Sequence, residues 1–307
     1  MRISPNKCVA CGNCLPVCPV GAISVDPALG RAVVDQDACV ECYTCWRGMS
    51  KEHLPPRFVR AVRRVAKALR FRFDPEPDIC PTDAIEPQEL AWPRIVRRAF
   101  SDPQVPHEST GIHGRGTAEV KTNDVTGRVE EGEAGFVVEF GRPGVATRFR
   151  DIQLMTRALA AIGVEFEKMN PVTTLMTDAA RGEIRTDILE ERVLSAIVEL
   201  KVPLGRVPEV LRVVKDVSRR VDTVVSVGVS TRCDARGEEP LRALLEAEGL
   251  PAYRGKTNLG LGRITKAVAT AAVASGQAWP GREAGGRRGA SLGAASEAGV
   301  REAPRLQ

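Results

Sequence analysis

The sequence predicts an α+β protein with two folded units, and three observations lead to this prediction. A duplicated cysteine phrase occupies residues 1–88, and a strand-helix-strand pattern occurs twice within residues 135–235. The last 32 residues contain almost no large apolar side chain. We therefore expect an N-terminal cysteine-rich domain with a helical insertion, then a βαββαβ-like open-sheet domain, then a disordered C-terminal tail.

Length and composition support this division. The 307 residues exceed the usual single-domain size of about 100 to 200 residues, and 43% hydrophobic with 27% charged residues is typical of a globular chain. No apolar run approaches the roughly 18 residues of a membrane-spanning helix. The first residues, MRISPNKC, reach a cysteine before any signal-peptide core, so we expect a cytoplasmic protein. In a reducing compartment its nine cysteines indicate metal binding, not disulfides.

Eight of the nine cysteines form two copies of one phrase. The copies read C-V-A-C-G-N-C from Cys8 and C-V-E-C-Y-T-C from Cys39, and a Cys-Pro pair closes each copy. A 4Fe-4S cubane needs four thiolates, and a C-x2-C-x2-C loop supplies three of them. In runs of this type the closing cysteine ligates the other cluster. The predicted ligands are Cys8, Cys11, Cys14 and Cys80 for cluster one, and Cys39, Cys42, Cys45 and Cys18 for cluster two.

Residues 1–88 resemble the bacterial two-cluster ferredoxin family in both triads, both Cys-Pro closures and the Ala-Ile frames that follow them. The resemblance implies a pseudo-twofold domain that transfers single electrons at low potential. The second copy departs from the family pattern by a 31-residue insertion, which lies within residues 46–79 and lengthens the path to Cys80. Zinc sites also use C-x2-C pairs, but they have no use for a third cysteine at the next step.

The insertion predicts a basic amphipathic helix over residues 56–71. Residues 47–72 carry nine basic side chains and one acidic, so the positive charge of the chain is concentrated there. Such a helix either covers a small core or docks an acidic electron-transfer partner or a membrane surface. We predict an acidic electron donor at residues 57–72, and no nucleic acid, because no binding motif accompanies the charge. The apolar stripe is Phe58, Val62, Val65, Ala66 and Leu69.

The remaining chain is divided by composition and periodicity. A Gly/Pro-rich connector is expected over 89–134, a helical extension over 236–275 and the disordered tail over 276–307. Within the α+β domain, 135–235, two helices on one face of an open sheet are expected. The expected strands are 136–140, 164–167, 193–202 and 223–230, and the expected helices are 150–162 and 208–219.

Other candidate site residues are few. His113 lies in a glycine-rich loop and is the tentative catalytic proton donor, although a solvent-facing loop histidine is the commoner case. Cys233 is read as a packing residue. No NAD or FAD motif is found, and a flavin in an irregular site would leave little local signature. Arginine suits planar carboxylates, so basic residues near glycines could hold a small aromatic carboxylate; they are Arg142, Arg148, Arg150, Lys256 and Arg263.

Several stretches of the second half are similar to ferredoxin-type 6-hydroxynicotinate reductases. They include GIHGRGTAEVKTNDVTGR from residue 111, FGRPGVATRFRD from 140 and GKTNLGLGR from 255. This resemblance implies a ferredoxin-dependent reductase that adds electrons to a pyridine-ring acid. The alternative is a non-catalytic ferredoxin-type carrier or redox sensor, in which the α+β domain binds a ligand or partner.

Overall fold

The computed structural model contains helices and strands mixed along the chain, so the predicted α+β class is confirmed. The helix expected near 264–274 and the tail expected over 276–307 lie outside the described residues. The residues that the structure describes are 1–49, 53–71, 79–106, 128–142, 144–234 and 236–250.

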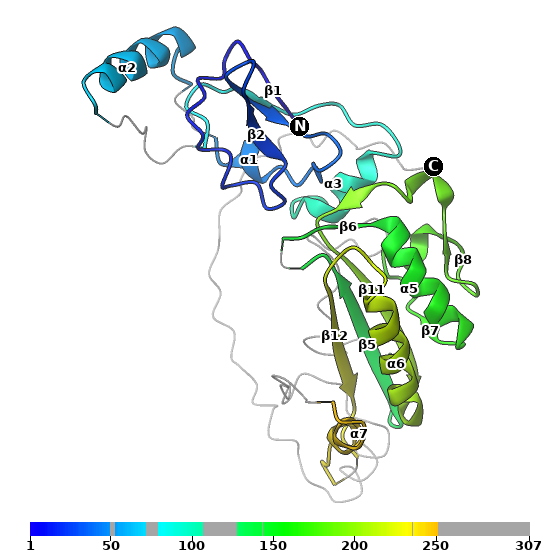
Figure 1. Cartoon of the computed structure of the whole chain (residues 1–307). Coiled ribbons are helices and arrows are strands. Elements are labelled where there is room, and N and C mark those ends of the chain that lie inside the picture. The colour runs from blue at the N-terminus through cyan, green and yellow to red at the C-terminus, as the bar shows by residue number, and fades with distance from the viewer. Residues whose placement is uncertain (50–52, 72–78, 107–127, 143, 235, 251–307) are drawn as a thin grey trace, which may run out of the picture. The chain divides into compact units, whose positions relative to one another are not determined.

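Two small antiparallel sheets frame the N-terminal unit (Figure 1). The repeated Ala-Ile frames take equivalent places in it, because Ile23 begins β2 and Ile85 begins β4. Both isoleucines and the alanines before them are buried beside the cysteines. The pairs are β1 (Arg2–Ile3) with β4 (Ile85–Glu86), and β2 (Ile23–Asp26) with β3 (Arg31–Val34).

Two helices lie at and after the end of the second cysteine triad. The first, α1 (Thr44–Arg47), starts inside the triad, and the second, α2 (Pro56–Ala68), is the helix expected over residues 56–71. Proline at the first helical position fixes the start of α2, since its φ suits a helix and its missing N–H is not needed there. The helix ends before Leu69, and Arg70 has a φ of 60°.

The apolar stripe of α2 is divided between two sides of the helix, because two of its members, Val62 and Ala66, are half-buried. Phe58, Val65 and Leu69 are 60%, 59% and 62% exposed, whereas the neighbouring Val59 is 1% exposed. Helical spacing identifies a stripe but does not say which side of the helix meets the rest of the domain. Here the side with Val59 faces the domain, and Phe58, Val65 and Leu69 face outward.

A helix also lies within residues 89–134, where the sequence predicts a connector. This helix, α3 (Ile95–Ser101), buries Val96 and Phe100 in the core of the sheet domain. The helix has seven residues, which is too short a run to register as a period among prolines and charges.

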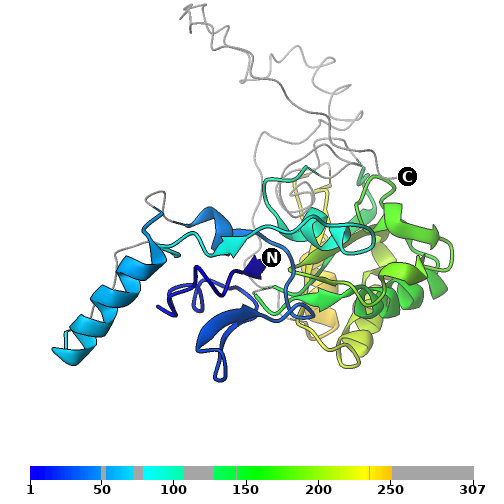
Figure 2. The same ribbon diagram turned by 90° about the horizontal axis from the view of Figure 1, so that it is seen from above.

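The main sheet has four strands in the order β12-β5-β11-β7, and each neighbouring pair is antiparallel. α5 (Phe149–Ala161) follows β5, and α6 (Val207–Ser218) follows β11. Both helices lie on the same side of the sheet (Figures 1 and 2). The strands are β5 (Glu133–Phe140), β7 (Glu165–Phe166), β11 (Ala196–Pro203) and β12 (Val225–Thr231).

Short elements complete the described chain. The strand expected over 193–202 is divided, because Val193 pairs with Thr147 and β11 begins at Ala196. The sequence did not predict the two-residue pairings, since such short strands carry no alternation. These elements are β6 (Thr147–Arg148) with β10 (Arg192–Val193), β8 (Met176–Asp178) with β9 (Glu183–Ile184), the 3-10 turns Thr173–Leu175, Thr186–Ile188 and Leu204–Arg206, and α7 (Leu241–Ala247).

One face of the main sheet forms the largest core. Alternate residues of the central strands β5 and β11 point to the two helices, as a period of two requires. The other alternate set includes Glu139 and Glu199, so the second face is partly polar. The fully buried residues between sheet and helices include Phe136, Phe140, Phe149, Ile152, Met155 and Leu159.

Neighbouring positions of α5 test this packing. Met155 is 0% exposed and Leu154 is 46% exposed. Met155→Ala should lower the free energy of unfolding by about 2 to 5 kcal/mol, because it leaves a cavity in the core. Leu154→Ala should stay within roughly 0.5 kcal/mol of the parent in anaerobic urea unfolding followed by circular dichroism. Equal losses would contradict the orientation of α5.

Candidate metal centre

Four cysteines line a pocket in the first half of the N-terminal unit. Cys8, Cys11 and Cys14 come from the loop after β1, and Cys80 comes from the turn before β4. The pocket also includes the apolar side chains of Ile3 and Ile85. These four are the residues predicted from the sequence as ligands of cluster one.

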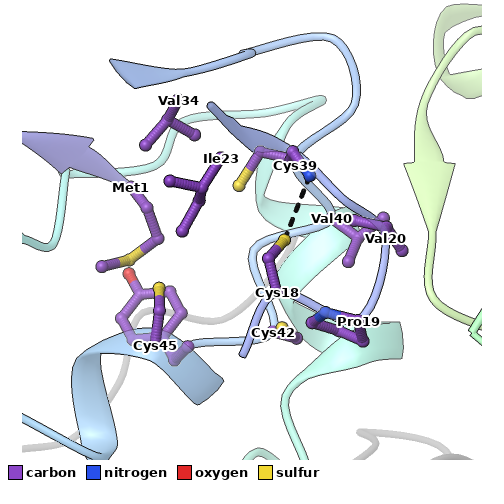
Figure 3. Close-up of a pocket in the computed structure, with 12 residues that line it drawn as sticks. Met1, Cys18, Pro19, Val20, Ile23, Val34, Cys39, Val40, Cys42 and Cys45 are labelled. Carbon is purple, nitrogen blue, oxygen red and sulfur yellow. Dashed lines mark hydrogen bonds between the residues drawn. The ribbon is translucent and has the colours of Figure 1, made fainter. Parts of the chain in front are cut away.

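A second pocket holds the other four cysteines of the duplicated phrase. Cys39, Cys42 and Cys45 line it together with Cys18 (Figure 3). Its remaining lining is almost wholly apolar, including Met1 and Val34. The structure thus brings together each predicted set of four, with the fourth member of each set drawn from the other copy.

The two cysteine loops share one backbone conformation. Ala10 and Gly12 of the first loop have φ values of 55° and 87°, and their counterparts Glu41 and Tyr43 have φ values of 55° and 61°. Positive φ is costly for residues with a Cβ atom, so it must be held by the surroundings. Because the second loop adopts it without glycine, the conformation belongs to the cysteine loop itself and turns the three thiols inward.

Backbone amides donate hydrogen bonds to the sulfurs in equivalent places. The amide of Ala22 donates to Cys18 Sγ over 3.2 Å, drawn in Figure 3, and the amide of Ala84 donates to Cys80 Sγ over 3.2 Å. The amide of Ala10 likewise donates to Cys8 Sγ over 3.4 Å. Hydrogen bonds to sulfur favour the thiolate and contribute to setting the potential of a bound cluster.

Burial makes the unligated thiols hard to ionise. Desolvation, followed by the proximity of other cysteines, raises the pKa of Cys14 and of Cys45 to about 12. A thiolate at such a position needs compensating positive charge, which coordinated iron supplies. The two pockets therefore suit a metal cluster better than free thiolates.

The chemistry of the donor set fits 4Fe-4S clusters. Each pocket offers four thiols and amide donors to sulfur, the first coordination requirements of a cubane. Within the described ranges, no three His, Cys, Asp or Glu side chains are arranged to hold a single metal ion.

Buried ion pairs hold the loop of the second pocket in place. Arg97 is 5% exposed, donates to the carbonyl oxygens of Asp37 and Cys39 over 2.9 and 2.8 Å, and pairs with Glu191. Glu41 is fully buried and accepts hydrogen bonds from Arg94 Nη2 over 2.7 Å and from the amino group of Met1. Burial opposes ionisation of Glu41, but these cations outweigh it and lower its pKa.

The sequence did not reveal these residues as parts of the site. Arg94 and Arg97 lie in the stretch that predicts a connector, where charged residues are ordinary. Because they are three residues apart, the two arginines lie on one face of a helix. That face contacts the cysteine loop only because α3 packs beside Cys39. No local sequence signal would have identified them.

The other predicted site residues are dispersed. His113, Lys256 and Arg263 lie outside the described residues. Arg148 pairs with Asp37 over 2.5 Å and Arg150 with Glu190 over 2.8 Å, so both are engaged. Cys233 is exposed, which contradicts its interpretation as a packing residue.

Arg142 is the predicted basic residue with the loosest contacts among those described. Its side chain is 34% exposed and lies 3.7 Å from Glu139 and 3.5 Å from the hydroxyl of Ser195. It follows Gly141, which has a φ of 80° directly after the end of β5. A planar anion could displace either weak contact.

Comparisons with known proteins agree with the cysteine chemistry. Residues 1–24 match the family model described as a 4Fe-4S binding domain. Over 42 residues the chain is 48% identical to Ferredoxin-1 of Rhodobacter capsulatus and 45% identical to a ferredoxin-like protein in the vnf region of Azotobacter chroococcum mcd 1. Each alignment covers 14% of this chain and 62% of the relative. No solved structure gives a significant match.

The N-terminal part of the chain therefore carries a ferredoxin-type iron-sulfur domain that binds 4Fe-4S clusters and serves electron transfer. The matches span less than two thirds of each ferredoxin and do not reach the sheet domain. None of the described helices has the length and apolar character needed to cross a membrane.

Removing one fourth cysteine tests the predicted wiring. Cys80→Ala should lose about half of the iron, since a set of four is broken while Cys18 still completes the other set. Iron analysis and electron paramagnetic resonance of anaerobically purified protein measure this loss. Cys233→Ala, which changes the exposed ninth cysteine, is the matched control and should keep all its iron. An unchanged iron content in Cys80→Ala would contradict the wiring.

Proposed function

We propose that the protein is a cytoplasmic iron-sulfur oxidoreductase with two 4Fe-4S clusters. Single electrons enter at the N-terminal domain, pass between the clusters and leave for an acceptor bound by the sheet domain. Cluster one would be held by Cys8, Cys11, Cys14 and Cys80, and cluster two by Cys39, Cys42, Cys45 and Cys18.

One observation carries this proposal: the loop of the second pocket packs directly on the sheet domain. Val40 and Cys42 are buried together with Ala146 and Leu194, which flank β6 and β10. A Cβ atom built on Gly144 would lie 3.1 Å from the carbonyl oxygen of Pro19, beside Cys18. A carrier that only meets soluble partners has no need to bury one cluster loop against a second domain. Such packing suits electron transfer within the chain.

The acceptor is proposed to be an N-heteroaromatic acid such as 6-hydroxynicotinate. The sequence resemblance of the second half supports this class, and Arg142, near the β5–β6 turn, supplies a cation for the carboxylate. Reduction of one ring double bond takes two electrons and two protons. Two clusters supply the electrons one at a time, His113 is the proposed donor of one proton, and solvent water supplies the other. A flavin between clusters and substrate would be compatible with this sequence of steps.

The proposed reduction can be tested with chemically reduced protein. Anaerobic holoprotein with measured iron and flavin content should be reoxidised by 6-hydroxynicotinate, which restores its visible absorbance. Arg142→Gln should raise the KM at least about tenfold, because it removes a charge-assisted pair of hydrogen bonds to the substrate carboxylate. Arg150→Gln, a cation already paired with Glu190, is the matched control and should leave the KM unchanged.

Failure of reoxidation with intact clusters and any bound flavin replenished would favour the alternative function. In that case the chain would be an electron carrier or redox sensor whose sheet domain binds a ligand or partner. The relatives named as ferredoxins favour this alternative, but their matches end before the sheet domain.

We further propose that α2 docks an acidic electron-transfer protein. The exposed stripe of Phe58, Val65 and Leu69 offers apolar contact, and α2 contains no acidic residue. Arg57, Arg64 and Lys67 are exposed beside it and would meet the partner's carboxylates. This arrangement combines an apolar centre with a charged rim, as transient docking surfaces do.

Charge reversal distinguishes docking from a plain structural cover. The variant with Glu in place of Arg57, Arg64 and Lys67 should accept electrons from an acidic donor ferredoxin at least about tenfold more slowly at low salt and nearly normally at high salt. Arg236→Glu, an exposed cation outside α2, is the control and should behave as the parent. Rates equal to the parent's at both salt concentrations would contradict docking on α2.

A further inference from the structure

One edge of the main sheet carries a long strand without the features that normally protect an edge. Within the part of the chain that the structure describes, β12 pairs with β5 on one side only and is the outermost strand (Figure 1). Its seven residues include no charged side chain and no proline. The opposite edge strand, β7, has two residues, and its Glu165 is 67% exposed. Natural edge strands are usually short or charged, because an unprotected edge pairs with another strand.

Alternate residues of β12 have backbone groups that point away from the sheet. The amide of Gly141 donates to the carbonyl oxygen of Val224 over 3.0 Å, so these two opposite residues form a hydrogen-bonded pair. Hydrogen-bonded and non-hydrogen-bonded pairs alternate along an antiparallel ladder, so the next bonded pair is Ser226 with Glu139. The backbone N–H and C=O groups on the open side of β12 therefore belong to Val225, Val227, Val229 and Thr231.

The sequence of β12 is nearly the same in both directions from Gly228. Valine and threonine are both β-branched, so they are similar in shape. Positions at equal distances from the glycine carry the same or similar residues: Val227 with Val229, Ser226 with Ser230, and Val225 with Thr231. An antiparallel pair of two such strands, with a two-fold axis at Gly228, brings like residues together at every position. This self-complementarity is what a two-fold interface between identical chains requires.

The same register satisfies the open backbone groups. With the axis at Gly228, Val227 lies opposite Val229 of the second copy, and both residues have their N–H and C=O groups on the open side. The two residues can therefore exchange both hydrogen bonds, and the axis repeats this pair. Gly228 meets its own copy at a non-hydrogen-bonded position, where Cα atoms come to about 4.5 Å. Glycine suits this close approach of two backbones because it has no side chain.

The side chains of β12 favour the same partner. Opposite residues of a ladder share a face, so Val225, Val227 and Val229 lie on the face of the sheet that α5 and α6 cover. Val225 and Val229 pack against the core, whereas Val227 is 38% exposed. In the two-fold pairing Val229 of the second copy covers this valine. No charged side chains lie opposite each other in the seven-residue seam, so no repulsion opposes it.

We propose that two copies of this chain form a two-fold dimer in which their β12 strands pair antiparallel about Gly228. Each four-stranded sheet is then continued by the sheet of the other copy. A seam of seven residues is smaller than a standard interface of about 1,600 Å², so the dimer is reversible, with a dissociation constant of about 1 to 100 µM. The cysteine pockets and α2 take no part in this contact, so the inference is independent of the proposed function.

Sedimentation equilibrium of the anaerobic holoprotein tests the dimer. The parent should pass from monomer to dimer between about 1 and 500 µM. Val227→Pro removes an outward N–H but none of the bonds to β5, since proline is accepted where the amide of an edge strand faces solvent. It removes two hydrogen bonds per dimer, so the dissociation constant should rise at least about tenfold. A parent that stays monomeric over the whole range would overturn the inference.

Mixing two variants tests the register and the identity of the partner. Ser226→Lys with Ser230→Lys places like charges opposite each other across the seam, and so does Ser226→Glu with Ser230→Glu. Each double variant alone should dimerise at least about tenfold more weakly than the parent, and a mixture of the two should form mixed dimers, because opposite charges then meet.

The control for added charge is Ser24→Lys, at an exposed serine of β2, which should dimerise as the parent does. Circular dichroism and iron content verify the fold of every variant. Folded double variants that dimerise as tightly as the parent, or a mixture that stays monomeric, would overturn the inference. A parent dimer that Val227→Pro leaves unchanged would overturn it as well.

Discussion

The arrangement of eight thiols in two crossed groups of four is the constraint on which the rest of the structure depends. Each pocket takes three cysteines from one copy of the duplicated phrase and one from the other. Clusters bound in this way would tie the two copies together, a role that the four short strands of this unit can fill only weakly. The positive φ values repeated in both loops show how closely the backbone follows this requirement.

The two pockets are alike in their cysteines and unlike in their surroundings. The insertion between Cys45 and Cys80 adds α2 beside the first pocket, and α3 brings Arg94 and Arg97 beside the second. The first pocket thus faces a helix with an exposed apolar stripe, and the second faces a folded domain. In our proposal these different neighbours give the duplicated unit a direction of electron flow, from the side of α2 to the side of the sheet domain.

The sequence predicted most of what depends on local spacing. The cysteine triads, the start of α2 and the longer elements of the sheet domain all follow from motifs or periods of two and 3.6 residues. It did not predict the burial of Arg97 or the outward orientation of Phe58, because these depend on which body packs on a helix. The two-residue strands and α3 were also missed, since they are too short to produce a period. His113 lies outside the described residues, so its predicted role stays a prediction.

The central claim is that this chain holds two 4Fe-4S clusters, and metal and sulfide analysis of the unaltered protein purified without oxygen tests it most directly. The account predicts about eight iron atoms and about eight acid-labile sulfides per chain, with little zinc. Protein that contains zinc alone, or about four iron atoms per chain despite full reconstitution, would contradict it.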